Sequence, residues 1–171
     1  DLNNWDTSSV TAMSEMFNGA IRFNQPLRSW ITSSVTDMSY MFYNAIAFNE
    51  DMNGWDTSSV TTMTHMFSMA TLFNQDLDAW TSVSSVTSME SMFNGASNFN
   101  GKISTWDVSS VHMGYMFYNA KKFNQPIGNW DVSKVTTFDN AFSYASAFTQ
   151  DLSKWTGSKA ETTQSNIFYG A

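Results

Sequence analysis

Residues 5–29 read Trp-Asp-Thr-Ser-Ser-Val-Thr-Ala-Met-Ser-Glu-Met-Phe-Asn-Gly-Ala-Ile-Arg-Phe-Asn-Gln-Pro-Leu-Arg-Ser, and the pattern restarts at the next Trp. The tryptophans recur every 24 to 26 residues, at Trp5, Trp30, Trp55, Trp80, Trp106, Trp130 and Trp155. A fixed period of about 20–50 residues is typical of a solenoid, in which each repeat forms one coil. The period predicts a single solenoid domain over residues 1–171, with regular coils over 1–154 and a degenerate or capping coil over 155–171.

One part of each coil has the apolar spacing of a helix. In the first coil, Met13, Met16, Phe17 and Ala20 are separated as on one face of a two-turn helix. Thr11 precedes them, and threonine is a suitable N-terminal cap. We therefore predict a helical turn over residues 14–18 and their equivalents in every regular coil.

Another part suits an extended strand. The segment Phe-Asn-Gln-x-Leu-x-x-Trp, as in residues 23–30, would pair with its equivalents in a parallel ladder with about 4.8 Å between coils. Pro26 and Pro126 have no amide hydrogen to donate, so the ladder should be short and begin near the leucine. The predicted fold class is an α/β repeat, a solenoid of six to seven coils with a short parallel strand ladder plus helical turns.

The recurring apolar residues are predicted to form the core. We expect Trp55, Met63, Met66, Phe67 and Phe73 of the third coil to be buried. The seven tryptophans would then form a stacked aromatic wall, because offset ring packing adds to burial. The alternative for the tryptophans is a set of exposed rings that stack on carbohydrate or peptide, and the alternative for the methionines is an adaptable binding surface.

A ladder of asparagines lies between apolar positions of the repeat. Its members are Asn24, Asn49, Asn74, Asn100 and Asn124. A buried side-chain amide at such a corner can satisfy backbone groups of the adjacent coil, as polar groups inside a fold require. We predict a structural role for this ladder.

Composition excludes several classes of function. The net charge is −7, so a basic footprint for nucleic acid is absent. No stretch approaches the roughly 20 apolar residues of a membrane span. The two histidines, His65 and His112, occupy different coil positions and lack a ligand set for zinc. We expect no catalytic residue, no cofactor and no metal.

Two groups of carboxylates are weak candidates for a cation site. Glu50, Asp51, Asp76 and Asp78 occupy neighbouring positions of the second and third coils. A solvated acidic patch is the simplest interpretation, and a weak cation site or a contact with a basic partner is the alternative. A second group follows the tryptophans, at Asp6, Asp56, Asp107 and Asp131. Its interruptions favour aspartates that form turns over a calcium ladder.

The repeat resembles a known family. Phe-Asn-Gln-x-Leu-x-x-Trp-Asp-Thr-Ser-Ser-Val-Thr-x-Met-Ser-x-Met-Phe is similar to the signature of the BspA-like leucine-rich-repeat surface proteins, found in bacteria, including mycoplasma lipoproteins, and in algae. The resemblance covers residues 1 to about 155 and implies a right-handed leucine-rich-repeat-like solenoid. It also implies a cell-surface or extracellular location and a role in adhesion or protein binding, with no catalytic residues to carry over.

We therefore expect a non-catalytic protein-binding or adhesion solenoid of a surface protein. The alternative is a structural subunit or spacer within a larger extracellular or membrane-associated assembly. A minor alternative is ice binding through ladders of threonine. The chain begins inside a repeat, so the N-terminal face is expected to continue into more repeats or to meet a partner.

Overall fold

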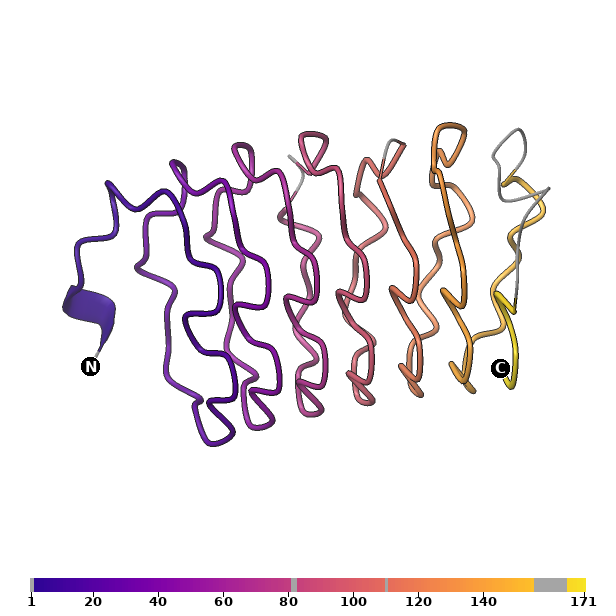
Figure 1. Cartoon of the computed structure of the whole chain (residues 1–171), viewed down its shortest axis with the longest axis horizontal. Helices are drawn as coiled ribbons and strands as arrows, with labels where there is room; N and C mark the ends of the chain where they lie inside the picture. Colours follow the sequence, from indigo (N-terminus) through magenta and orange to yellow (C-terminus); the bar gives the residue numbers. More distant parts are fainter. Residues whose placement is uncertain (1, 81–82, 110, 156–165) are drawn as a thin grey trace.

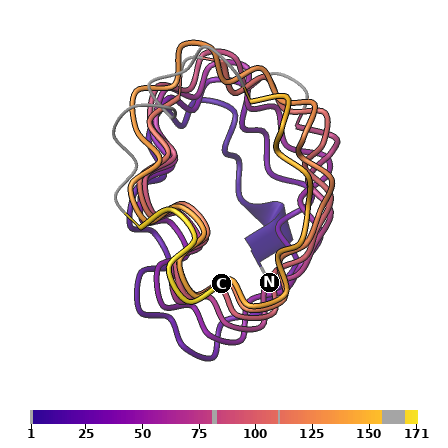
Figure 2. The same ribbon diagram turned by 90° about the vertical axis from the view of Figure 1, so that its right-hand side faces the viewer.

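In the computed structural model, which describes residues 2–80, 83–109, 111–155 and 166–171, the chain winds into coils stacked along one axis (Figure 1). Seen along that axis, successive coils follow nearly the same outline (Figure 2). We number the coils one to seven from the Trp that starts each. In the described ranges the regular secondary structure is one short 3-10 helix, η1 (Leu2–Asn4), and isolated parallel bridges. The predicted α/β fold class is wrong.

The bridges lie away from the predicted strand. They join Ala12, Asp37, Thr62, Ser88 and His112 of successive coils, just before the first Met of each repeat. Near the last apolar position of the repeat (Leu27 and its equivalents), most hydrogen bonds between coils involve a side chain. The amide of Gln75 donates to the backbone oxygen of Asn49 at 2.8 Å. The predicted strand ladder near the leucine is therefore wrong, because side-chain amides replace most of its backbone pairing.

The predicted helix is replaced by a ribbon of turns, which we call the turn segment (residues 13–20 and their equivalents). Every second amide donates to a carbonyl oxygen of the next coil at 2.8–3.0 Å, as in Met13, Glu15, Phe17 and Gly19. The amides between them close four-residue turns, as when Asn18 donates to the oxygen of Glu15 at 3.0 Å. A helix would direct all these amides back along its own chain. The bonds between coils therefore exclude it.

Two left-handed residues recur in the turn segment. In coil two they are Tyr40 and Asn44, with φ of 56° and 54°, and Gly19 and Gly95 occupy the second of these positions in other coils. A left-handed conformation interrupts a right-handed helix and costs about 1–2 kcal/mol for most residues. Glycine and asparagine tolerate it best. Their recurrence at this position explains locally why no helix forms.

The core contains the repeated apolar side chains. Trp55 is 3% exposed, and Met63, Met66, Phe67 and Phe73 are 0% exposed, so the predicted burial in coil three is confirmed. Each such side chain contributes about 1.5–3 kcal/mol through burial. Equivalent rings stack from coil to coil, as Trp30 does on Trp55 at 6.4 Å and 2°.

The tryptophans also hold the coils together through their indole nitrogens. The Trp55 Nε1–H donates to the carbonyl oxygen of Leu27, 28 residues earlier in the chain, at 3.2 Å, and Trp80 does the same to Met52 at 3.0 Å. This satisfies the one polar group of a buried ring. Trp5 differs, because it belongs to the first coil and is 55% exposed.

The asparagine ladder bonds as predicted but from a different environment. Each side-chain oxygen accepts the backbone N–H of the equivalent residue in the next coil, as Asn24 does from Asn49 at 2.8 Å. Asn24, Asn49, Asn74 and Asn100 are solvent-exposed, and Asn124 is half-buried. The prediction of a buried amide is wrong, because the ladder runs along the outside of a corner.

The threonines form two further ladders. The hydroxyl of Thr36, predicted to cap a helix, donates to the oxygen of Thr11 in the preceding coil at 3.1 Å. Without a helix it caps nothing, so that prediction is wrong. Two residues after the tryptophans, Thr7, Thr32 and Thr57 are 4%, 1% and 1% exposed. These threonines face inward, whereas Thr36 and its equivalents in the other ladder are solvent-exposed.

The degenerate coil predicted over residues 155–171 is described only in part, because residues 156–165 lie outside the described ranges. Residues 166–171 add one more turn segment to the stack. Phe168 lies 5.6 Å from Phe142 with the rings nearly parallel, and the amide of Phe142 donates to the oxygen of Ile167 at 2.9 Å. The aromatic ladder of the core therefore extends into coil seven.

Candidate interaction surface

Tyrosine is confined to one part of the repeat. The chain has six tyrosines, and all of them lie in turn segments: Tyr40, Tyr43, Tyr115, Tyr118, Tyr144 and Tyr169. The core-facing positions of that segment hold Met, Phe and Ala, so the tyrosines occupy the positions between them. None is buried, and three are at least 40% exposed. The outer side of the turn segments therefore carries aromatic rings.

In coils five to seven these rings are continuous, and we call them the tyrosine strip (Tyr115, Tyr118, Tyr144 and Tyr169). Tyr115 lies 5.8 Å from Tyr118 within coil five. Tyr118 meets Tyr144 edge to face at 5.4 Å and 80°, and Tyr144 meets Tyr169 at 5.5 Å and 86°. Tyr115 and Tyr144 are 40% exposed and Tyr169 is 60% exposed. The strip crosses three coils while keeping its rings in contact.

Local backbone geometry positions the centre of the strip. Tyr144 occupies a left-handed position, with φ of 60°. Gly170 is its neighbour in coil seven, and a Cβ there would lie 2.8 Å from the Tyr144 ring. Only glycine leaves room for that ring in its present place. The stacked coils thus hold the strip on a rigid support.

The phenol group of Tyr144, at the centre of the strip, stays uncharged at neutral pH. The pKa of Tyr144 is raised above 10.0, first by desolvation and then by Tyr169 and Tyr118. A neutral phenol both donates and accepts hydrogen bonds, and its ring adds apolar contact area. Such a surface suits a protein or another ligand with mixed polar and apolar groups.

A second aromatic cluster lies on the same side of coils two and three. His65 stacks on Tyr40 at 4.6 Å and 6°, and Tyr43 lies 6.3 Å from His65. Desolvation lowers the pKa of His65 below 6.5, and the charge of Glu90 opposes this shift. His65 is therefore an uncharged, half-buried member of an aromatic cluster.

Glu90 lies close to the second histidine as well. The His112 Nδ1 is 3.9 Å from the Glu90 carboxylate. The Nδ1 atoms of His65 and His112 are buried and make no hydrogen bond. Within the described ranges, no group of three or more His, Cys, Asp or Glu side chains has the arrangement to hold a metal ion.

The acidic candidates of coils two and three have separate partners. Asp76 forms an ion pair with Lys102 at 3.1 Å and also accepts its backbone N–H at 2.9 Å. These bonds lower the pKa of Asp76 below 3.8. Asp51 accepts the N–H of Asn53 at 2.9 Å, and Asp78 accepts the hydroxyl of Thr105 through its backbone oxygen at 2.9 Å. Glu50 is half-buried.

The aspartates that follow the tryptophans form turns. Asp6 and Asp56 each accept the N–H of the serine two residues on, at 3.0 and 2.9 Å. Asp107 and Asp131 do the same, at 3.2 and 2.9 Å. The serine bonds lower the pKa of Asp6, Asp56 and Asp131 below 3.8. This is the local hydrogen bonding by which aspartate favours turns.

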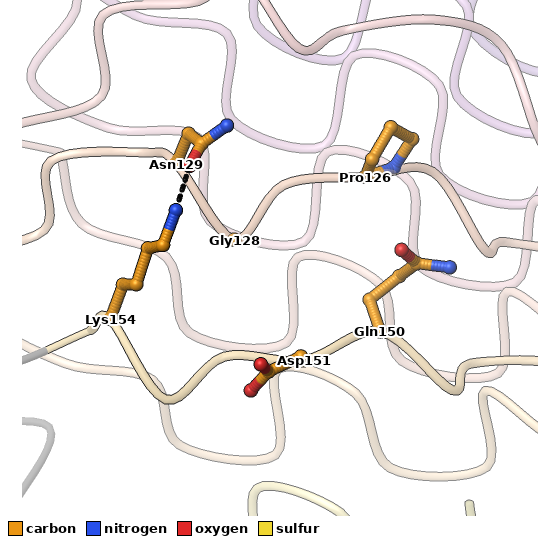
Figure 3. Close-up of a pocket in the computed structure, with 6 residues that line it drawn as sticks. All are labelled: Pro126, Gly128, Asn129, Gln150, Asp151 and Lys154. Atoms are coloured by element: carbon orange, nitrogen blue, oxygen red, sulfur yellow. Dashed lines mark hydrogen bonds between the residues drawn. The ribbon is translucent and has the colours of Figure 1, made fainter.

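A shallow polar depression of about 220 Å³ lies where coils five and six meet (Figure 3). Its lining residues are Pro126, Gly128, Asn129, Gln150, Asp151 and Lys154. The Lys154 ammonium donates to the Asn129 side-chain oxygen at 2.8 Å, and Asp151 accepts the N–H of Ser153 at 2.8 Å. Both charged groups are thus held by neighbours, in a site that lacks a nucleophile beside a base.

Sequence reasoning missed the tyrosine strip. The signal was present, because every tyrosine of the chain falls in one short segment of the repeat. A helical interpretation of that segment hides the signal, since it distributes the outward residues around a cylinder. The ribbon of turns instead aligns equivalent positions along the solenoid axis.

Comparison with known proteins places the chain in one family. A family model described as "Mycoplasma protein of unknown function, DUF285" matches residues 1–82 and again residues 81–171. The chain therefore belongs to the DUF285 family. No curated protein and no solved structure matches it. In the described ranges, no helix has the length and apolar character needed to cross a membrane.

Proposed function

We propose that this DUF285 protein is a non-catalytic binding module that docks a protein partner on the tyrosine strip. The single observation behind the proposal is the run of tyrosines in mutual contact across three coils, three of them 40–60% exposed. Tyrosine is enriched among the residues that dominate the energy of protein interfaces. A ring with two rotatable side-chain torsions also loses little entropy on binding.

The scaffold supports the same function. Binding residues are most effective when a rigid framework holds them, and here the framework is a column of stacked rings and hydrogen-bonded coils. The resemblance to BspA-like surface proteins suggests adhesion as the biological role and the cell surface or the extracellular space as the location. An enzyme is a poor alternative. Neither the depression between coils five and six nor the surroundings of His65 and His112 place a base beside a nucleophile.

Site-specific crosslinking tests the proposal. A photoreactive phenylalanine analogue replaces Tyr144 in one variant and Ile31, an exposed residue that follows Trp30 in coil two, in a matched control. Illumination of cells that produce the full-length protein should give one discrete protein adduct from position 144 and none from position 31.

Two results would contradict docking on the strip. Equal adducts from both positions would indicate contact without preference for this surface. The absence of a protein adduct from position 144 and from Tyr115 and Tyr169 would favour the structural spacer. A Tyr115→Ala and Tyr169→Ala double variant should lose the adduct while it melts at the same temperature, since both side chains are exposed.

A further inference from the structure

Coils one to three expose a second, chemically different surface. Ile21, Ile46 and Leu72 are 49%, 39% and 50% exposed, at the bends that follow three successive turn segments. Ala47 donates to the oxygen of Ile21 at 3.2 Å, and Leu72 donates to the oxygen of Ile46 at 3.2 Å. The three residues therefore lie on one hydrogen-bonded ladder of bends in adjacent coils, with Ile21 and Ile46 at equivalent positions and Leu72 one residue further along its coil. We call them the apolar corner.

The fold does not require apolar residues at this corner. The same hydrogen-bonded ladder continues into later coils, where Lys122 donates to the oxygen of Ser97 at 3.2 Å and Ala147 to that of Lys121 at 3.1 Å. Lys121 and Lys122 are exposed there. Polar and charged residues can thus occupy the same bend with the same backbone hydrogen bond. Exposed apolar residues that folding does not need, grouped on neighbouring coils, are typical of an interaction site.

Charge divides the solenoid in the same place. Residues 1–80 contain nine Asp and Glu and two Arg, which gives a net charge of −7. Residues 81–171 contain six Asp and Glu and six Lys, which gives zero. The whole net charge of the protein therefore belongs to the half that carries the apolar corner. A partner is attracted to this half when it is cationic.

The spacing of the corner fits a helix. Hydrogen-bonded coils lie about 4.8 Å apart, and equivalent core rings such as Phe42 and Phe67 lie 5.5 Å apart. An α-helix advances about 5.4 Å per turn. A helix parallel to the solenoid axis would then place one apolar side chain per turn against each coil.

We propose that the apolar corner binds a cationic amphipathic helix of a partner protein, laid along the solenoid axis. Its apolar stripe would cover Ile21, Ile46 and Leu72, and its lysines or arginines would face carboxylates such as Glu50 and Asp51. A second copy of this chain is disfavoured, because a symmetric corner-to-corner contact would bring together two halves of charge −7. The inference concerns a surface other than the tyrosine strip and does not depend on it.

A synthetic helix tests the proposal directly. The probe is a fluorescein-labelled peptide of leucine and lysine, about 18 residues or five turns long, with its leucines in one stripe. Its control has the same composition in scrambled order. Fluorescence anisotropy with the full chain should show the amphipathic peptide binding at least about tenfold more tightly than the scrambled one, since both carry the same charge.

Substitutions then locate the site. Ile46→Lys and Leu72→Lys should each weaken binding by about tenfold or more, because they remove an apolar contact and repel the peptide. Ile31→Lys is the matched control, since Ile31 is a 52% exposed isoleucine that follows Trp30, outside the apolar corner. It introduces the same charge and should change binding by less than about twofold.

Three outcomes would overturn the proposal. The first is equal binding of the two peptides, and the second is an equal loss in Ile31→Lys and Ile46→Lys, which would indicate charge attraction alone. The third is a dimer in sedimentation that only Ile46→Lys dissociates, which would assign the corner to a second copy. A Tyr144→Ala variant should bind the peptide normally, so failure here leaves docking on the tyrosine strip to its own test.

Discussion

Replacement of Gly19 by alanine has opposite effects on stability in a left-handed turn and in a helix. Gly19 lies next to the end of the turn segment of coil one with φ of 69°, and a Cβ built there meets no atom within 4 Å. Any change in stability therefore comes from the backbone and not from a clash. In a helix, glycine is about 1 kcal/mol less favourable than alanine, so the substitution would stabilise the protein.

In the turn segment the same substitution should destabilise. An L-residue in the left-handed region costs about 1–2 kcal/mol, and the stiffer unfolded chain offsets about 0.4–1 kcal/mol of this. The expected net loss is about 1 kcal/mol. For a protein of this size, that lowers the melting temperature by about 2–4 °C.

Urea unfolding followed by tryptophan fluorescence and thermal melting followed by circular dichroism both measure the change. Gly19→Asn is the control, because asparagine tolerates the left-handed region and should lose less. Asn44→Ala repeats the test inside coil two, where φ is 54°. A higher melting temperature in Gly19→Ala and Asn44→Ala would refute the turn-segment conformation.

Phe67→Ala should destabilise by about 3–5 kcal/mol, because the ring is 0% exposed and stacks on those of coils two and four. Phe168→Ala, at a 46% exposed ring, should lose clearly less in the same urea titration, and equal losses would contradict the stacked core. The pKa of His65 is lowered below 6.5, so the folded state binds fewer protons, and stability should fall as the pH drops through 6.5. In the His65→Phe variant, the melting temperature should therefore change less between about pH 8 and pH 5. An unchanged dependence on pH would argue against this effect of His65. The pKa of Asp56 is lowered below 3.8, so its contribution is present above pH 3.8 and is lost as the pH falls further. Asp56→Asn should therefore melt below the parent protein at neutral pH and approach it in acid; a gap that persists in acid would show that the charge is not the cause.

The core was predictable because burial depends on side-chain chemistry and on the period. Positions such as Met66 and Phe67 are apolar in nearly every repeat, and a repeated apolar position has to face a neighbouring coil. That inference needs no knowledge of backbone conformation. It holds equally for a helix, a strand or a ribbon of turns.

The interaction surfaces were less predictable. The tyrosines are visible in the sequence, but their contact across coils depends on the turn segment, in which Tyr118 and Tyr144 become neighbours. The apolar corner likewise depends on a hydrogen-bonded bend that brings Ile46 beside Leu72. The acidic cluster was visible, but the pairing of Asp76 with Lys102 was not.

By itself, the sequence determined the period, the residues that face inward and the positions at which asparagine links one coil to the next. All three follow from the repeated sequence. Coils with the same residues at the same positions can bury their apolar groups and hydrogen-bond their polar groups only by stacking in register. The local conformation was decided by the tertiary structure. Spacing of Met, Met-Phe and Ala is compatible with a helix, but backbone amides that bond to the next coil cannot also bond along their own chain. Residues in the left-handed conformation, such as Gly19 and Asn44, allow the ribbon of turns to form, and the hydrogen bonds between stacked coils favour it over the helix.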